Sequence, residues 1–157
     1  MQEKKRDRED PIIVVGNYRS GTSITAGVLH ACGAWIGTAT PANQHNPKGY
    51  FENEALKSLL HLMLMWSRYN DSDKLPPDDL RGFAMFDRFH YLLELAMRGD
   101  GYSGGVRVFK NTKIVLFWRY FHQVYPNAKW VIVRRDASKI VESLQRATTQ
   151  LFWMHPK

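Results

Sequence analysis

A β-branched run that ends in a glycine-rich loop constrains this fold more than any other feature of the sequence. Residues 12–15 read Ile-Ile-Val-Val, which is typical of a strand buried on both faces of a parallel sheet. The loop Gly16-Asn17-Tyr18-Arg19-Ser20-Gly21-Thr22-Ser23 follows directly. Apolar residues then recur at helical spacing, and Gly33 predicts the end of that helix. The apolar positions of the helix are Ile24, Val28 and Leu29.

The composition of this loop predicts an anion-binding site. Gly16, Gly21 and Ser23 fit the phosphate-loop pattern GxxxxGK[ST], but Thr22 stands in the lysine position. Small residues let backbone N–H groups and a helix N-terminus close around an anion, and hydroxyl side chains add donors. We therefore predict phosphate binding, although a glycine-containing turn with an incidental arginine would leave the same pattern. The candidate binding residues are Arg19, Ser20, Gly21, Thr22 and Ser23.

Strands and helices alternate along the rest of the chain. Apolar residues at three- and four-residue spacing predict helices over 52–69, 80–98 and 114–125, and another from about Asp136. Short apolar runs predict strands at 106–109 and 130–133, and turn-forming residues predict loops at 37–50 and 70–79. The predicted inward positions of the first two of these helices are Ala55, Leu56, Leu59, Leu60, Met63, Trp66, Phe86, Phe89, Leu93 and Met97.

This alternation predicts an α/β fold in which a parallel sheet forms the middle of three layers, with helices on both faces, as in P-loop nucleotide-binding proteins. Ligands of such folds bind at the carboxyl ends of the strands. Lys110 follows the second predicted strand, and Arg134-Arg135 follow the third. We therefore expect these cations to share one site with the loop 16–23.

Composition narrows the class of protein. Residues 1–10 carry four basic and four acidic side chains and predict a flexible tail before a single domain, 11–157. No stretch reaches the roughly 18 apolar residues of a membrane span, and Cys32 is the one cysteine, which favours a soluble protein of the reducing cytoplasm. The histidines lack metal-ligand spacing, so no metal is expected.

The net charge of +7 arises in the last third of the chain, where residues 105–157 carry ten Lys or Arg against two Asp or Glu. This excess attracts an anionic ligand or polymer, although a solvated basic surface would look the same. A non-catalytic nucleic-acid-binding domain would use these charges together with aromatic side chains. Helix and strand spacing places those aromatics in the core instead, so nucleic acid is not the expected partner. They are Trp118, Tyr120, Phe121 and Trp130.

The residues that follow the strands also bear on the reaction. A magnesium-dependent P-loop enzyme places an acidic metal ligand after a neighbouring strand, whereas these strands end in Lys110 and Arg134-Arg135. A sulfuryl group carries less charge than a phosphoryl group, so protein cations can serve in place of a metal. The pattern favours sulfuryl transfer, with a P-loop nucleotide kinase as the nearest alternative.

The same residues resemble those of sulfotransferases that use 3′-phosphoadenosine 5′-phosphosulfate (PAPS). Tyr18–Ser23 is similar to the 5′-phosphosulfate loop of that family, and Arg135 and Ser143 have the eight-residue spacing of its 3′-phosphate contacts. Residues 46–52 and 109–113 also resemble family segments. The resemblance implies PAPS as the co-substrate and, as acceptor, a hydroxyl of a glycan, lipid, small alcohol or tyrosine.

The sequence departs from the family in four places. Tyr18 stands where many members have proline. Arg19 stands where the soluble small-molecule enzymes have lysine; an arginine at this position is typical of the glycan- and protein-directed branches. Asn111-Thr112 replaces Asp-Pro. Family members usually continue well beyond the second motif, so we expect a short or truncated member that ends at Lys157.

Three residues are candidates for the chemistry of transfer. Arg19, always charged and rich in donors, is expected to stabilise charge on the bridging oxygen of the donor. The resemblance implies that Lys110 assists, although a strand-end lysine is also often simply solvated. Glu52 is the preferred general base, with Glu54 and His45 as alternatives, while an acid favoured at a helix start is the plainer interpretation of Glu52.

The final helix is predicted to have two edges. At 100° per residue, Lys139, Ser143 and Arg146 fall within a wedge of about 60°. An adjacent apolar stripe is formed by Ile140, Leu144, Ala147 and Leu151. We expect the stripe to pack on the sheet and the cationic edge to face the nucleotide, although an ordinary amphipathic helix with solvated charges has the same pattern.

Overall fold

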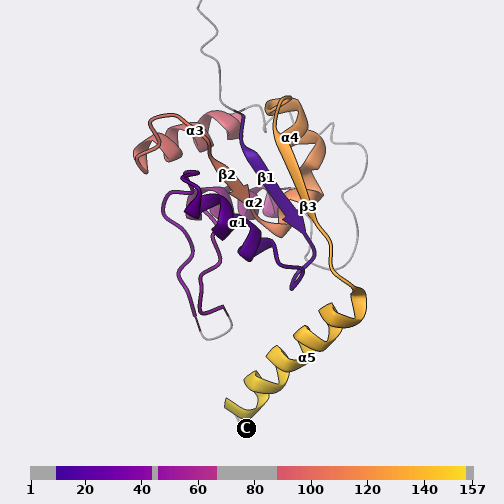
Figure 1. Ribbon diagram of the computed structural model, residues 1–157. Helices are drawn as coiled ribbons and strands as arrows, with labels where there is room; N and C mark the ends of the chain where they lie inside the picture. The colour runs from indigo at the N-terminus through magenta and orange to yellow at the C-terminus, as the bar shows by residue number, and fades with distance from the viewer. Residues whose placement is uncertain (1–9, 44–45, 67–87, 155–157) are drawn as a thin grey trace, which may run out of the picture.

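The centre of the fold is a parallel sheet. The computed structural model describes residues 10–43, 46–66 and 88–154. Three strands, β1 (Ile12–Gly16), β2 (Val108–Lys110) and β3 (Lys129–Val133), lie in the order β2-β1-β3 (Figure 1). In the central strand, Ile12 is paired with Val108 on one side and with Lys129 on the other. The prediction of an α/β fold with a parallel sheet is confirmed.

Alternate residues of β1 pack into two separate clusters. Ile13 and Val15 join a large cluster that includes buried side chains from α2 (Glu54–Trp66) and α3 (Phe89–Gly99). The same cluster includes residues of the 3₁₀ helix η2 (Thr112–Phe117) and of α4 (Trp118–Val124). Val14 joins a smaller cluster on the side of α1 (Thr22–Ala31). The buried predicted core residues are Leu56, Leu59, Leu60, Met63, Phe89, Leu93 and Met97.

Several predicted bounds shift by a few residues, and some lie outside the described residues. The helix expected over 114–125 consists of η2 followed by α4, and the strand expected at 106–109 begins at Val108. Residues 37–43 and 46–50 form neither a helix nor a strand of the sheet. The predictions for residues 67–69, the loop 70–79, the helix start at 80–87, Phe86 and the side chain of Trp66 fall outside what the structure describes.

Helix α1 turns a different face to the sheet from the one predicted. Ile24 and Val28 are 70% and 57% exposed, whereas Thr22 and Ala26 are buried and Leu29 is half-buried. The helix begins directly at the end of the loop, so the position of Thr22 fixes its rotation. Small side chains therefore face the sheet at close range, and the apolar pattern alone was misleading. The end at Gly33 is confirmed, since Ala34 N donates to Leu29 O at 3.1 Å in a helix-ending turn.

The last helix, α5 (Ala137–Met154), does not cover the sheet as predicted. Figure 1 shows it extending away from the strands, and Val141 and Leu144 remain exposed. β3 is an outer strand of the described sheet, so within the described residues no further strand lies beyond it for α5 to pack on. The helix starts at Ala137, one residue after the expected Asp136.

Asp100 connects the end of α3 to the segment that follows α1. Its carboxylate accepts hydrogen bonds from Thr38 N at 2.6 Å and Thr38 Oγ1 at 2.5 Å, and from Asn53 Nδ2 at 3.3 Å. The Thr38 hydroxyl is the main cause that lowers the pKa of Asp100. Because the folded pKa is depressed, this contribution to stability is present at neutral pH and is lost as the pH falls below about 4.

We expect Asp100→Asn to lower the free energy of unfolding by about 1 kcal/mol at pH 7, since the carboxylate is partly solvated. The difference from the wild type should shrink as the pH falls toward 3. Urea denaturation at pH 7 and pH 3 measures it, with the exposed Glu142→Gln as the matched control. A difference of the same size at both pH values would contradict the assignment.

Candidate functional site

The loop after β1 is a tight turn at the start of α1. Ser20 donates twice to Asn17 O, from its backbone N at 3.2 Å and from its hydroxyl at 2.6 Å. Arg19 and Gly21 have positive φ angles of 64° and 109°. A Cβ at Gly16 would lie 2.5 Å from Val133 O, so only glycine allows β1 and β3 to approach at this point. The loop thereby brings the N-terminus of α1 to the carboxyl edge of the sheet.

The predicted anion-binding side chains differ in how open they are. Ser20 and Thr22 are buried, Ser23 is half-buried, and Arg19 is exposed at the tip. The Ser20 hydroxyl proton is directed within the loop, toward Asn17 O. Because the first N–H groups of a helix have no partner within it, the start of α1 offers backbone donors beside these side chains.

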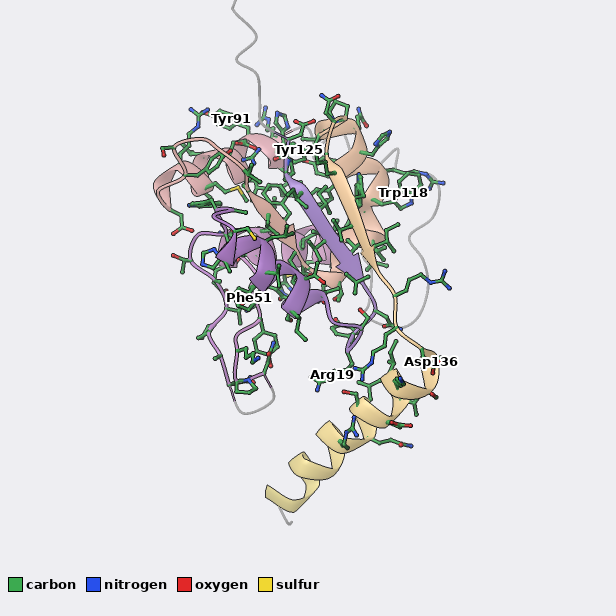
Figure 2. The ribbon with its side chains drawn as sticks, viewed as in Figure 1. Arg19, Phe51, Tyr91, Trp118, Tyr125 and Asp136 are labelled. Carbon is green, nitrogen blue, oxygen red and sulfur yellow. The ribbon has the colours of Figure 1, made fainter. Side chains whose placement is uncertain are left out.

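Arg19 joins the loop to the second predicted motif. Its Nε donates to Ser143 Oγ at 2.9 Å, and Arg135 Nη1 donates to Arg19 O at 3.0 Å. Ser143 is only 7% exposed even though it lies on the projecting helix α5. Figure 2 shows Arg19 between the loop and the first turns of this helix. Residues more than a hundred positions apart in the chain, which the resemblance to sulfotransferases assigned to one nucleotide, are therefore in direct contact.

The candidate base and the strand-end lysine form an ion pair. Lys110 Nζ lies 2.5 Å from Glu52 Oε1, and Asn111 Nδ2 donates to Glu52 Oε2 at 3.2 Å. The Lys110 and Glu52 side chains are 4% and 17% exposed. Asn111 also accepts a hydrogen bond from Lys113 N at 2.9 Å and so caps η2. The sequence marked Asn111 only as a departure from the family, yet it holds both the glutamate and the turn that follows β2.

The alternatives to Glu52 are placed differently. Glu54 accepts from Thr40 Oγ1 at 2.5 Å and lies 3.2 Å from Lys57 Nζ, and the Thr40 hydrogen bond is the main cause that lowers the pKa of Glu54. It thus pairs with Lys57 rather than with Lys110. His45 lies outside the described residues.

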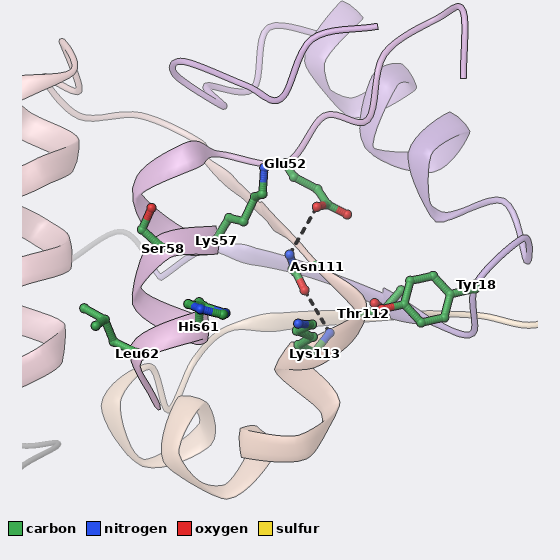
Figure 3. A pocket seen from close by; sticks show the side chains of 9 residues that line it. All are labelled: Tyr18, Glu52, Lys57, Ser58, His61, Leu62, Asn111, Thr112 and Lys113. Atoms are coloured by element: carbon green, nitrogen blue, oxygen red, sulfur yellow. Dashed lines mark hydrogen bonds between the residues drawn. The ribbon is translucent and has the colours of Figure 1, made fainter. Parts of the chain in front are cut away.

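A cavity of about 530 Å³ opens beside this ion pair. Figure 3 shows Glu52 and Asn111 in its lining, with Tyr18 of the loop at one end and Leu62 of α2 at the other. The other lining residues are Lys57, Ser58, His61, Thr112 and Lys113. A cavity of this size accommodates a small substrate or one ring of a larger one.

Sequence reasoning missed most of this cavity. Lys57, Ser58, His61 and Leu62 recur at three- and four-residue spacing along α2, at the edge of its buried stripe. That polar edge is a signal in the sequence, but the stripe drew attention to the core face instead. Sequence spacing bears on His61 only as a possible metal ligand, not as part of a cavity. Within the described residues, no group of three His, Cys, Asp or Glu side chains is placed to hold a metal ion.

The other cationic and aromatic side chains that the sequence pattern singled out do not line the cavity. Arg134, Lys139 and Arg146 are exposed. Of the four aromatics, Tyr120 and Phe121 are buried and Trp130 is half-buried, as predicted, whereas Trp118 is about half exposed beneath Arg119. No helix in the described ranges has the length and apolar character that crossing a membrane requires.

Comparison with known proteins shows a similarity over part of the chain. Residues 97–156 match the model of a family described as a sulfotransferase domain. The matched segment contains Lys110, Arg135 and Ser143, whereas the loop 16–23 and Glu52 lie outside it. The searches of curated proteins and of solved structures each returned no match. The predicted resemblance to sulfotransferases is confirmed for this segment.

Proposed function

We propose that this chain binds PAPS and transfers its sulfuryl group to the hydroxyl of an acceptor, as a three-layer α/β protein of the P-loop nucleotide-binding type. The contact of Arg19 with Ser143 and Arg135 carries the proposal. It joins a phosphate-type loop, which lies outside the sulfotransferase match, to two residues inside that match. One nucleotide that carries phosphates at both ends would explain why these two motifs lie together.

The donor nucleotide would bind along this contact. Its 5′-phosphosulfate would meet the start of α1 and the side chains of the loop, among them Thr22 and Ser23. Its 3′-phosphate would be bound by Arg135 and Ser143. Arg19 Nε and Ser143 Oγ now satisfy each other, so the donor would replace this hydrogen bond by contacts with its own oxygens.

The acceptor would enter the cavity beside Glu52. The cavity runs from Tyr18, a residue of the donor loop, along the polar edge of α2. An acceptor bound there would direct its hydroxyl toward the end of the loop at which the sulfate lies. A glycan, lipid, small alcohol or tyrosine each supplies such a hydroxyl.

Transfer would then proceed in line. The acceptor oxygen attacks sulfur, the bond between sulfur and the bridging oxygen of the phosphate breaks, and 3′,5′-adenosine bisphosphate leaves. The acceptor proton passes to the Glu52 carboxylate, which Lys110 and Asn111 hold in place. Arg19 and Lys110 would stabilise the negative charge that grows on the bridging oxygen, the kind of preorganised electrostatic effect that lowers barriers most.

Ligand-induced stabilisation tests the donor. We expect 3′,5′-adenosine bisphosphate without magnesium, at about 100 times its Kd, to raise the melting temperature by about 5–10 °C. The reason is that the ligand binds the folded chain and not the unfolded one. A thermal-shift titration in the presence of EDTA measures this, with adenosine 5′-monophosphate as the comparison that lacks the 3′-phosphate. Stabilisation by magnesium-ATP alone would instead indicate a P-loop kinase and reject the proposal.

A further inference from the structure

Phe51 has a backbone conformation that an aromatic residue rarely adopts. Its φ is +54°, in the left-handed region, and it immediately precedes Glu52. For a residue with a Cβ, this conformation costs about 1–2 kcal/mol relative to the right-handed one. Such a cost persists only where surrounding contacts enforce it, and it is most often found at functional sites.

Helix α1 supplies the contact that holds Phe51. A Cβ placed on Gly27 would lie 3.0 Å from both Cε2 and Cζ of the Phe51 ring, so the ring rests directly on the helix backbone. The His30 ring lies on the same side, with its centroid 6.2 Å from that of Phe51. Phe51 also packs against the smaller core cluster, and Figure 2 shows Phe51 beside α1. The ring is therefore anchored between a helix and the sheet.

The chain is anchored again directly after Phe51. Thr40 N donates to Glu52 O at 2.8 Å, which fixes the backbone of the glutamate. Buried Asn53 donates from Nδ2 to Ile36 O at 2.9 Å and accepts from Leu56 N at 3.0 Å. With an anchor on each side, Glu52 has little freedom except at its side chain. The carboxylate consequently lies against Lys110 rather than in solvent.

We infer that Phe51 seated on Gly27 is a positioning device that holds the Glu52 carboxylate against Lys110 and Asn111 at the edge of the cavity. Phe51 has no polar side-chain atom with which to bind these three groups, so it acts through the backbone of its neighbour Glu52. The strained φ angle of Phe51 raises the free energy of the folded chain, and it fixes the direction in which the Glu52 side chain points. That the position of the Glu52 carboxylate matters for sulfuryl transfer rests on the proposed function, whereas the positioning of Glu52 by Phe51 does not.

Gly27→Ala tests the inference. In a helix interior this change ordinarily stabilises a protein by about 0.5–1 kcal/mol, but here the methyl group meets the Phe51 ring. We expect the ring to shift and the ion pair to open. The ¹³Cδ signal of Glu52 and the ¹⁵Nζ signal of Lys110 should then move to the positions of solvent-exposed side chains. The Kd for 3′,5′-adenosine bisphosphate should change less than twofold.

Matched variants separate positioning from folding. Val28→Ala changes the next, exposed residue of α1 and should leave both signals in place. Phe51→Ala should move the same signals, and Gly27→Ala combined with Phe51→Ala should match Phe51→Ala alone, because no ring remains to be displaced. If Gly27→Ala fails to fold, Phe51→Ala and the double variant decide the question.

The outcomes for positioning and for function are distinct. Unchanged Glu52 and Lys110 signals in both Gly27→Ala and Phe51→Ala would overturn the inference. Signals that move while the rate of sulfuryl transfer stays constant would support positioning and reject Glu52 as the base. If the wild-type chain transfers no sulfate, the spectroscopic comparison still tests the inference.

Discussion

Replacing Arg19 by alanine is expected to weaken binding of 3′,5′-adenosine bisphosphate about 10- to 100-fold and to lower sulfuryl transfer about 10²- to 10³-fold. Arg19 would supply charge-assisted hydrogen bonds to the donor and stabilise the oxygen that leaves sulfur. Alanine shares the preference of arginine against the φ of +64° observed here, so the substitution removes the cation without relieving the backbone. Isothermal titration without magnesium measures the affinity, and release of the bisphosphate from PAPS measures the rate.

Two other substitutions serve as controls for this experiment: one removes a different exposed arginine, and one keeps the positive charge at position 19. Arg98→Ala removes an exposed arginine in the last turn of α3, outside the proposed nucleotide site, and should change the affinity less than twofold. Arg19→Lys keeps the charge but loses the planar fork, so it should recover part of the binding. Wild-type affinity in Arg19→Ala would show that the loop does not bind the donor.

Replacing Arg107 by alanine is expected to lower the free energy of unfolding by about 3–5 kcal/mol. Arg107 is 2% exposed at the other end of β2 from Lys110 and forms a two-pronged pair with Glu94, at 2.9 Å and 2.7 Å. Tyr125 also donates to Glu94, at 2.8 Å, and the guanidinium lies 4.8 Å from the centre of the Tyr102 ring. Truncation of Arg107 to alanine would leave the Glu94 carboxylate without its cation in a largely apolar environment.

Urea denaturation measures this loss. Arg107→Met combined with Glu94→Leu should recover much of the stability, because apolar replacements of a buried ion pair remove both charges together. Nucleotide affinity of the folded Arg107→Ala protein should stay unchanged, since the pair lies away from the loop. A cost below 1 kcal/mol for Arg107→Ala would contradict the assigned role of the pair.

Sequence patterns were sufficient to predict a parallel sheet and to predict that the ligand-binding residues lie at its carboxyl edge. β-branched runs identified β1 and β3, and the helical spacing in α2 and α3 identified buried residues such as Leu60 and Met97. The expectation that Arg19 and Arg135 share one edge followed from a general property of parallel sheets. Their hydrogen bond is consistent with that expectation.

What the sequence did not predict depends on contacts between distant residues. Periodicity shows that Ile24 and Val28 are apolar, but only the docking of the loop sets the rotation of α1 and leaves them exposed. Leu144 is likewise apolar, but it stays exposed because, within the described residues, no strand lies beyond β3 for α5 to pack on. The pairing of Glu52 with Lys110 joins residues 58 positions apart, and no local spacing encodes it.

Under the proposed function, the left-handed backbone of Arg19 sets folding stability against the chemistry of transfer. Glycine at this position would adopt a φ of +64° without steric cost, whereas arginine raises the free energy of the folded loop by about 1 kcal/mol. Optimisation of this chain for thermal stability alone would therefore select glycine and discard the cation at the tip. If the protein acts as proposed, attempts to stabilise it by design should leave position 19 unchanged, because gains there would come at the expense of the proposed activity.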